Sequence, residues 1–539
     1  RHSAEAALAD ETKMKLGSVA LLAAALFWAP VADAKTFRWA NDGDVNSLDP
    51  YARQETFLLS FTANIYEPLV RRDRDLKLEA ALATEWTQTA PTVWRFELRR
   101  NVKFHDGAPF TADDVVFSLE RANSQGSNLR SLFATFKEAR KIGPHTVEVE
   151  TLYPDPVFAD KMTQVAIMSQ AWCHEHNAQN SADLTKKEEN YATRNTNGTG
   201  PFILKSREPD VRTVLVVNPD WWDKPQHNLT EVEFTVISND ATRMAALLSG
   251  QIDMVYTVPP QDVERIARSE GLKIHQKPEF RTIFLGFDQT RDELIDSNIK
   301  GRNPFKDVRV RRAFYQAIDV DAIRARIMRN QATPTALMIG PGIAGFDPKL
   351  NVRPPFDPEG AKRLLADAGY PNGFELGMDC PNDRYVADEQ ICQAVVAMLA
   401  KVGVKVNLLA QTRLKFFAKA LGPNYNTSFY LLGFTPASTY DAHAVFEQVM
   451  QTRDAKRHKG DFNLGGWSNK RFDDLADQIE RETDRAKRAA MIDEAQRIHM
   501  QDIGHIPLHQ QALIWAARAN VELAQQADNF FPLRYVTVR

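Results

Sequence analysis

Residue types that bind metal ions gather at one point of the sequence. Cys173, His174, Glu175 and His176 are consecutive, and thiol, imidazole and carboxylate groups are the ligands that zinc takes in proteins. Consecutive residues on a loop rarely converge on one ion, and no second pair with Cys-x-x-Cys spacing accompanies them. We therefore expect a solvated loop here and no metal site.

Two further pairs of neighbouring residues have side chains suited to acid–base catalysis. His105 and Asp106 precede Gly107, which predicts a tight turn, while Asp113 and Asp114 fall at a predicted helix start, where the helix dipole explains them. The sequence has no GxGxxG loop after a strand, no HExxH helix and no GxSxG turn. We expect no catalytic residues and no cofactor. An exported peptidase or glycosidase is the alternative class, and it would need a nucleophile, a metal or paired carboxylates.

Composition narrows the class of protein. The chain has 539 residues with 67 basic and 70 acidic side chains, a net charge of −3. A nucleic-acid binder needs a basic surface to neutralise phosphates, so we expect no nucleic-acid partner. Three cysteines cannot form a disulfide scaffold at this length.

An apolar segment near the start indicates export. Met14 and Lys15 precede an apolar run from Leu16 to Ala29, and Ala32-Asp33-Ala34 provides small residues for cleavage. The alternative, a membrane anchor, requires roughly 20 apolar residues, and this run is shorter. We expect residues 1–34 to comprise upstream residues and a signal peptide cleaved after Ala34, which places the mature protein in the periplasm.

The remaining chain alternates predicted strands with predicted helices, which indicates an α/β fold. Period-two patterns predict strands, and stripes at helical spacing with Asp or Thr caps predict helices. Strands are expected at 36–40, 93–98, 146–151, 211–218, 231–237 and 404–408, and helices at 111–122, 242–248, 306–317, 357–368, 386–402 and 471–502.

Seven motifs follow one another in an order that resembles the family 5 solute-binding proteins of ABC importers, which include dipeptide-, oligopeptide- and nickel-binding proteins. Together they span nearly the whole mature chain. The motifs are Glu85–Arg121, Asn197–Phe202, Asn218–Trp222, Ala246–Asp253, Asn303–Asp319, Phe356–Phe374 and Asn463–Asn469, followed by Ile506–Leu508.

The resemblance implies a two-lobe periplasmic binding protein (type II, cluster C) with an extra subdomain in the first lobe. We place lobe 1 at 35–285, its extra subdomain at about 71–196, lobe 2 at 286–504 and a C-terminal return to lobe 1 at 505–539. The crossings are expected near 282–287 and 499–505. A ligand that touches both lobes would stabilise the closed form. The expected partners are a peptide or peptide-like ligand and the permease subunits of an ABC transporter, with the protein itself a monomer.

The resemblance also implies ligand contacts in the second lobe. Peptide-binding relatives carry an Asp that holds the ligand's amino terminus, but the matching position here is Ala437, and Asp441 and Glu447 are the nearby candidates to replace it. Arg384 lies where relatives bind the peptide carboxylate, and a guanidinium can grip a carboxylate with two hydrogen bonds. A structural Arg384 is the alternative. The aromatic residues Tyr385 and Phe434 are expected to wall the cavity.

First-lobe contacts are expected from Gln54, Glu55, Thr56 and Tyr66. A carboxylate anchor without the usual amine anchor leaves several ligand classes open: peptides, N-blocked peptides, opines, glycoconjugates and metal chelates.

Cys380 and Cys392 flank the Arg384 segment. An exported protein meets an oxidising compartment, so we predict a disulfide between them, two free thiols being the alternative. Cys173 has no evident partner and is expected to be free.

Overall fold

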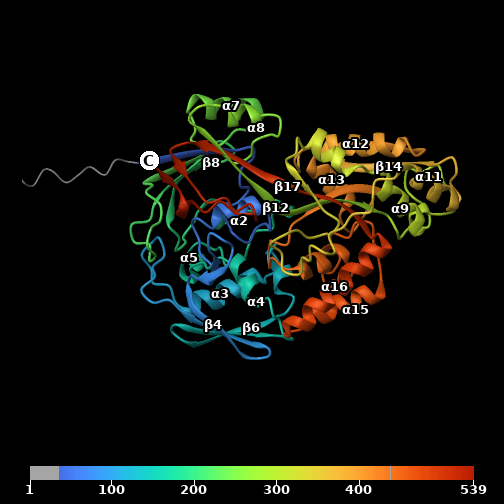
Figure 1. Ribbon diagram of the computed structural model, residues 1–539. Coiled ribbons are helices and arrows are strands. Elements are labelled where there is room, and N and C mark those ends of the chain that lie inside the picture. Colours follow the sequence, from blue (N-terminus) through green and yellow to red (C-terminus); the bar gives the residue numbers. More distant parts are fainter. Residues whose placement is uncertain (1–34, 438) are drawn as a thin grey trace, which may run out of the picture.

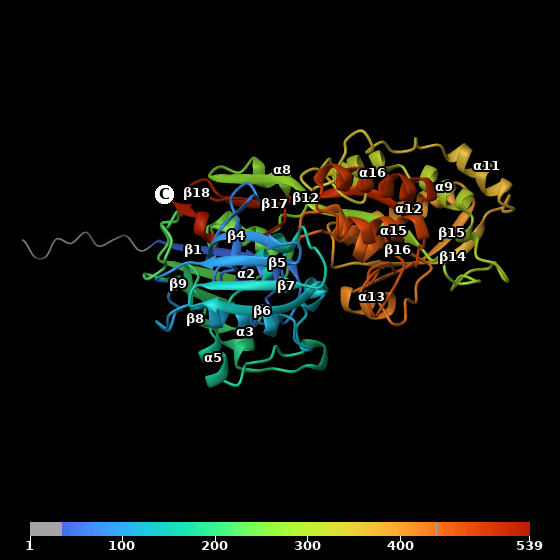
Figure 2. The ribbon, with the colours of Figure 1, turned by 90° about the horizontal axis from the view of Figure 1, so that it is seen from below.

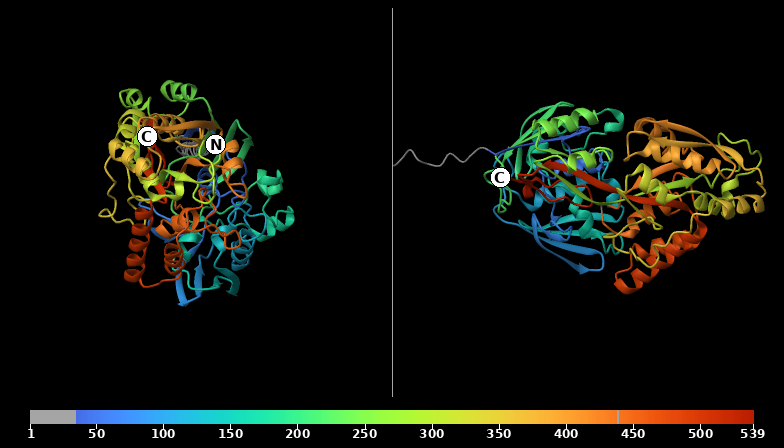
Figure 3. Two further views of the ribbon diagram at one scale, coloured as in Figure 1. Left: turned by 90° about the vertical axis from the view of Figure 1, so that its right-hand side faces the viewer. Right: turned by 45° about the horizontal axis from the view of Figure 1, so that its top comes forward.

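The computed structural model describes residues 35–437 and 439–539, and the expected signal peptide lies outside them. Two bodies stand side by side, and the strands β12 (Leu272–Phe287) and β17 (His505–Arg518) run from one to the other (Figure 1). The views in Figure 3 show the same two strands passing between the bodies. The fold is therefore a two-lobe α/β arrangement, as the sequence predicts.

One sheet of eleven strands extends through both lobes over the described residues. The paired strands β12 and β17 lie at its middle, and β13 (Ala332–Pro334) adds to β17. The others, in spatial order from the second lobe to the first, are β15 (Val404–Gln411), β14 (Phe374–Pro381), β16 (Phe429–Phe434), then beyond the central pair β11 (Met254–Val255), β1 (Thr36–Asn41), β10 (Glu231–Val236), β9 (Arg212–Val217) and β8 (Phe202–Glu208).

The chain crosses between the lobes where β12 changes its register. Leu272–Pro278 pair with Ala512–Arg518, whereas Thr282–Phe287 pair with β16 and with the earlier half of β17. We therefore define the first lobe as residues 35–278 and 512–539, and the second lobe as 282–510. The boundaries expected at 286 and 505 fall inside these two strands, a few residues from the register shift.

Each lobe has its own hydrophobic core. Trp39 and Trp515 pack in the first lobe, whereas Phe314 and Ile506 pack in the second. β17 thus contributes Ile506 to one core and Trp515 to the other, which ties the two lobes to the same strand.

A separate four-stranded sheet covers one side of the first lobe (Figure 2). It lies inside the segment expected to form the extra subdomain. Asp114 accepts the backbone N–H of Thr111 at 2.8 Å, so the predicted cap starts the helix that packs on this sheet. The elements are β4 (Ala83–Ala90), β5 (Val93–Leu98), β7 (Thr146–Thr151), β6 (Phe136–Gly143) and α3 (Ala112–Ala122).

Most predicted helices begin and end as their caps require. Asp357 accepts the N–H of Gly360 at 2.7 Å and Pro358 follows it, while Gly250 ends its helix in the left-handed region at φ 78°. The helices are α7 (Asp240–Ser249), α9 (Val308–Ala317), α11 (Pro358–Asp367) and α12 (Asp388–Ala400).

The single helix predicted over 471–502 is two helices, α15 (Lys470–Ile479) and α16 (Arg485–Asp502). The side chain of Asp484 accepts the backbone N–H groups of Ala486 and Lys487 at 2.9 and 3.1 Å. This cap begins a new helix, so the apolar pattern on both sides belongs to two helices that pack together.

The cysteine–histidine cluster does not form a solvated loop. It lies on α5 (Gln170–Glu175), where Cys173 is buried and free and His176 stacks on Tyr191 with ring centroids 4.0 Å apart. Ser169 begins this helix by accepting the N–H of Trp172, a cap that a loop interpretation overlooks. Within the described residues no three metal-ligating side chains come together.

His105 and Asp106 do lie in a turn. The N–H of Gly107 donates to the carbonyl of Phe104 at 2.9 Å, and Gly107 has φ 89°, which requires glycine. The turn interpretation of this pair is confirmed.

Candidate functional site

A cavity of about 200 Å³ lies between the two lobes. The first lobe contributes the start of α2 (Thr56–Thr62) and the region of α4 (Phe158–Lys161); the second contributes the segment after β14, the end of β16 and α14 (Ala442–Val445). Its polar lining consists of Gln54, Glu55, Thr56, Ser131, Asp155, Lys161, Gln164, Arg281, Arg384, Thr435, Thr439, His443, Glu447, Gln448, Glu480 and Arg488.

Two guanidinium groups, from Arg281 and Arg384, define one region of the cavity. Their Cζ atoms lie 5.9 and 5.2 Å from the ring centroid of Tyr385. Arg281 pairs with Glu279 at 3.2 Å, whereas no carboxylate of the described chain lies within 4 Å of Arg384. Glu55 and Glu279 act on Arg384 only through space, so its guanidinium is available for a direct ion pair with an anionic group of a ligand.

The pKa shifts of the two arginines reflect this difference. Burial and then the charge of Arg281 lower the pKa of Arg384. Burial also opposes the charged form of Arg281, but Glu279 outweighs it, and the pKa of Arg281 is raised. An anionic ligand group at Arg384 would relieve the unfavourable electrostatics there.

Local structure holds Arg384 in place. It follows β14, and the carboxylate of Asp388 accepts the backbone N–H groups of both Arg384 and Tyr385 at 3.0 Å. The hydroxyl of Tyr385 donates to the carbonyl of Gly433 at 3.1 Å. Cys380 and Cys392 are joined by a disulfide across this segment, between β14 and α12.

Four carboxylates of the described chain line the cavity, and two of them, Asp155 and Glu480, have a cationic partner. Lys161 pairs with Asp155 at 2.7 Å, and Lys459, which lies behind the lining, pairs with Glu480 at 3.0 Å. Burial opposes the ammonium of Lys161, but Asp155 raises its pKa.

Glu447 differs from these carboxylates. In the described chain no basic side chain lies within 4 Å of its carboxylate, and the carboxylate accepts one hydrogen bond, a 3.4 Å contact from Gln448. Glu447 also acts on the pKa of Lys161 through space, which places it in the same part of the cavity. The lining thus contains one cation, Arg384, and two carboxylates, Glu447 and Glu55, that form no ion pair within 4 Å in the described chain; Glu55 acts through space on Arg384.

The structure distinguishes the two candidates for a replacement carboxylate. Asp441 caps α14 and receives two hydrogen bonds from Arg488, at 2.6 and 2.7 Å. It is 3% exposed and does not line the cavity. Asp441 was a candidate to bind the amino end of a ligand, but Arg488 already neutralises its charge. Glu447, the other candidate, faces the cavity.

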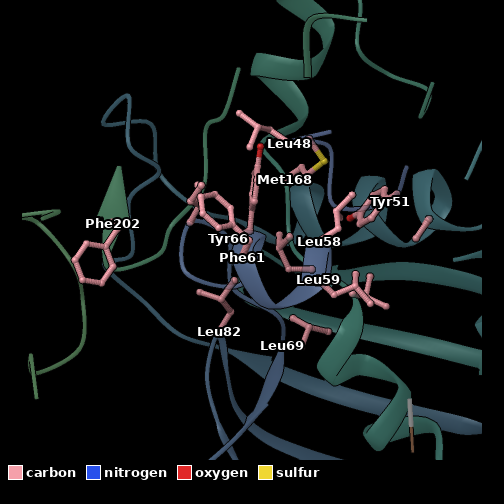
Figure 4. Close-up of a cluster of buried hydrophobic side chains, with 14 of the residues drawn as sticks. Leu48, Tyr51, Leu58, Leu59, Phe61, Tyr66, Leu69, Leu82, Met168 and Phe202 are labelled. Carbon is pink, nitrogen blue, oxygen red and sulfur yellow. The ribbon is translucent and has the colours of Figure 1, made fainter. Parts of the chain in front are cut away.

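Tyr66 also differs from expectation. It is fully buried in the core of the first lobe, among side chains such as Phe61 and Leu82 (Figure 4), and does not line the cavity. Its aromatic ring suits a core position as well as a binding site, and sequence alone does not separate the two.

The other predicted contact residues lie at the cavity. Glu55 and Thr56 begin α2, with Glu55 accepting the N–H of Leu58 at 3.1 Å. Phe434 packs against Phe462 with ring centroids 5.5 Å apart. Ala437 lines the same space, and its carbonyl accepts a hydrogen bond from Gln164.

The sequence analysis missed Arg281 and Gln164. Glu279 and Arg281 are two residues apart on β12 and so share one face of a strand. Two opposite charges directly before the apolar end of this strand are a signal that could have identified this site. No comparable signal marks Gln164.

The fold and the cavity between lobes define a ligand-binding protein, and the sequence matches the bacterial extracellular solute-binding proteins, family 5, over residues 77–470. The chain belongs to this family. No helix among the described residues has the length and apolar character needed to cross a bilayer.

Curated relatives and solved structures agree with this assignment. The glutathione-binding protein GsiB of Shigella flexneri serotype 5b is 24% identical over 511 residues, covering 94% of this chain and 95% of the relative. The periplasmic binding protein DppA of Helicobacter pylori, solved with the peptide STSA, has a TM-score of 0.78 at 23% identity and covers 94% of this chain and 98% of its own. AgaA of A. tumefaciens R10, solved with agropinic acid, has a TM-score of 0.77 at 22% identity, with 94% and 99% covered.

Proposed function

We propose that this protein is the periplasmic binding component of an ABC importer. It binds a zwitterionic peptide or peptide-like ligand between its lobes and delivers it to the permease as a monomer. Export would use the signal peptide expected at residues 1–34. The family and the names of relatives that bind glutathione or peptides support this class of ligand.

The observation that carries the proposal is the presence in one cavity of Arg384 and Glu447, two opposite charges that form no ion pair within 4 Å in the described chain. A ligand carboxylate at Arg384 would complete a charge-assisted, two-point contact, with Arg281 close by. A ligand ammonium at Glu447 would neutralise the other charge. Both contacts form inside a cavity made by the two lobes, so the ligand would favour their closed arrangement.

A second candidate is a dianionic non-peptide ligand such as an opine. The observation in its favour is the presence of two guanidinium groups, Arg281 and Arg384, beside the same tyrosine ring. One solved structure with this fold contains agropinic acid.

Thermal unfolding of ligand-free protein with matched ligands tests both candidates. The panel comprises glutathione, di- to pentapeptides with free, N-acetylated or C-amidated ends, opines and nickel–histidine chelates. A ligand at 100 times its Kd stabilises by about 2.7 kcal/mol, a readable shift.

The peptide proposal expects free peptides to raise the Tm, with amidation and acetylation each reducing the effect. A shift with opines alone supports the second candidate. If amidation has no effect on peptide binding, the role of Arg384 is refuted. If no peptide raises the Tm, the peptide proposal is refuted.

A further inference from the structure

A second chamber adjoins the interlobe cavity. It has a volume of about 100 Å³, and Gln164, Ala437 and Phe530 form part of the wall of both spaces. Most of its other walls belong to the first lobe, including the end of α2 at Ala63. Two spaces that share walls in this way can serve as parts of one binding site.

The second chamber presents mainly apolar groups. Pro68, Pro201 and Pro532 line it together with the rings of Trp221 and Phe531. These side chains offer shape and apolar contact, which suits an uncharged group of a ligand.

The charged residues at its wall already have partners. Glu67 accepts hydrogen bonds from Trp221 and Trp222 at 3.1 and 2.6 Å. Arg72 pairs with Asp160 at 2.7 Å, and Arg71 pairs with Glu79 at 2.7 Å. Arg534 pairs with Glu79 at 3.1 Å, and Asp528 accepts the hydroxyl of Tyr440, so each charged side chain of the wall has a partner in the described chain.

Two of the residues that line both spaces are hydrogen-bonded to each other. The side-chain Nε2 of Gln164 donates to the carbonyl of Ala437 at 2.7 Å, from the first lobe to the second. The Oε1 atom of Gln164 is buried without a hydrogen-bond partner in the described chain, and the residue is 8% exposed. Opposite it, Ala437 carries only a methyl group.

The unpartnered Oε1 atom of Gln164 carries a free-energy cost, and a hydrogen bond from a ligand would remove it. Rotation of the Gln164 side chain would open the way between the chambers past the small Ala437 side chain. The freed amide can then hydrogen-bond to a peptide group of the ligand, which replaces the bond to Ala437.

We propose that the two chambers form one binding site, in which the ligand's charged groups occupy the interlobe cavity and one apolar side chain enters the second chamber between Gln164 and Ala437. This inference rests on the proposed function and specifies its ligand. The preferred ligands are short peptides that carry a side chain of about leucine size at one position.

Isothermal titration calorimetry with trialanine and its three single-leucine variants tests this inference. Leucine at one position is expected to tighten binding about tenfold or more, as apolar pockets discriminate added carbons. Leucine at the other positions is expected to have less effect.

The variant Ala63→Phe is designed to fill the second chamber from a residue that lines only this chamber. Ala63 is exposed at the end of α2 and does not line the interlobe cavity, so the protein should fold and bind trialanine as before. The leucine preference should disappear. The matched control Ala444→Phe fills the interlobe cavity alone and should weaken all four peptides together.

A second variant, Ala437→Val, narrows the passage and should penalise the preferred leucine peptide more than trialanine. If the peptides bind but the leucine preference survives Ala63→Phe, the second-chamber inference is refuted and the proposed function stands. If the wild-type protein binds none of these peptides in calorimetry and none of the peptide panel in thermal unfolding, the proposed function and the second-chamber inference are both refuted.

Discussion

The hydroxyl of Tyr153 in the first lobe donates to Oε1 of Glu480 in the second lobe at 2.6 Å. The guanidinium of Arg481 lies 4.1 Å from the centre of the same ring. Burial and the neighbouring Glu480 raise the pKa of Tyr153, so the hydroxyl stays protonated and able to donate. The two lobes thus contact each other directly, without a ligand.

Removing this hydroxyl should weaken closure. Tyr153→Phe keeps the ring beneath Arg481 but loses a hydrogen bond that contributes about 1 kcal/mol, which lowers apparent ligand affinity about fivefold by favouring the open form. Calorimetry with the ligand found by thermal unfolding measures this. Tyr191→Phe, in α6 (Tyr191–Arg194) and stacked on His176, is the control and should bind like the wild type. Equal affinity in Tyr153→Phe would show that the contact does not contribute to closure.

Arg384→Met should have opposite effects on binding and on stability. Truncating one partner of a buried charge pair costs 2 kcal/mol or more in complexes, so affinity for free peptides should fall about 30-fold or more. The Tm of the ligand-free protein should rise, because a desolvated cation without a carboxylate partner is replaced by an apolar side chain. Arg413→Met, at the exposed start of α13 (Arg413–Ala420), is the control. A lowered Tm would mean that Arg384 is structural.

The sequence predicted the elements and the class of fold because these depend on local signals. The cap at Asp357 and the alternation in β1 are each contained within a few residues. The break at Asp484 was missed because an amphipathic pattern continues on both sides of it. The exact boundaries between the lobes depend on strand pairing, because β12 and β17 continue through both lobes and the register shift between Pro278 and Thr282 is a tertiary feature.

The candidate site was only partly predictable, for a physical reason. Arg384 and Glu447 could be named from the sequence, but whether each is neutralised depends on residues distant in the chain. Asp441 was an equal candidate until Arg488, 47 residues later, was found bound to it. Charge pairing of this kind is a tertiary property that no local motif encodes.

Glu447→Gln should weaken the contact with the ligand's amino end and leave the contact with its carboxyl end unchanged. The change keeps the size of the side chain but removes the charge, so free peptides should bind about tenfold or more weakly, whereas N-acetylated peptides should bind as they do to the wild type. Calorimetry with each peptide pair measures the difference. Asp441→Asn is the contrasting variant: it breaks the pair with Arg488 and should lower the Tm. An equal loss for free and acetylated peptides would contradict an ammonium contact at Glu447.

The disulfide between Cys380 and Cys392 should stabilise the segment that holds Arg384. Closing a loop of this length contributes about 3 kcal/mol in the chain-entropy model. The double variant Cys380→Ala/Cys392→Ala should therefore have a free energy of unfolding lower by about that amount, measured by urea unfolding. A thiol count on unreduced, denatured wild-type protein should give one thiol, from Cys173, and Cys173→Ala should give none. Three thiols would show that the bond does not form.

Acid should destabilise the protein through histidines buried at the start of β17. Burial lowers the pKa of His505 to about 3, and burial with the charge of Arg353 lowers the pKa of His509 to about 3. Unfolded histidine has a pKa of about 6.5, so below that pH the unfolded chain binds protons that the native state does not. The free energy of unfolding is therefore unaffected by these groups above about pH 7 and falls as the pH is lowered from 6.5 towards 3.

Urea unfolding at pH 7.5 and pH 5 measures this dependence. His509→Gln is the informative variant, because both ring nitrogens of His509 are buried without partners and their loss breaks no hydrogen bond. Between the two pH values the wild type should lose about 2 kcal/mol more than His509→Gln, the linkage expected for one histidine with these two pKa values. His458→Gln, at a side chain 53% exposed, should follow the wild type. If wild type and His509→Gln lose the same stability, His509 is protonated in the native state at pH 5, and the strand must accommodate an imidazolium beside Arg353.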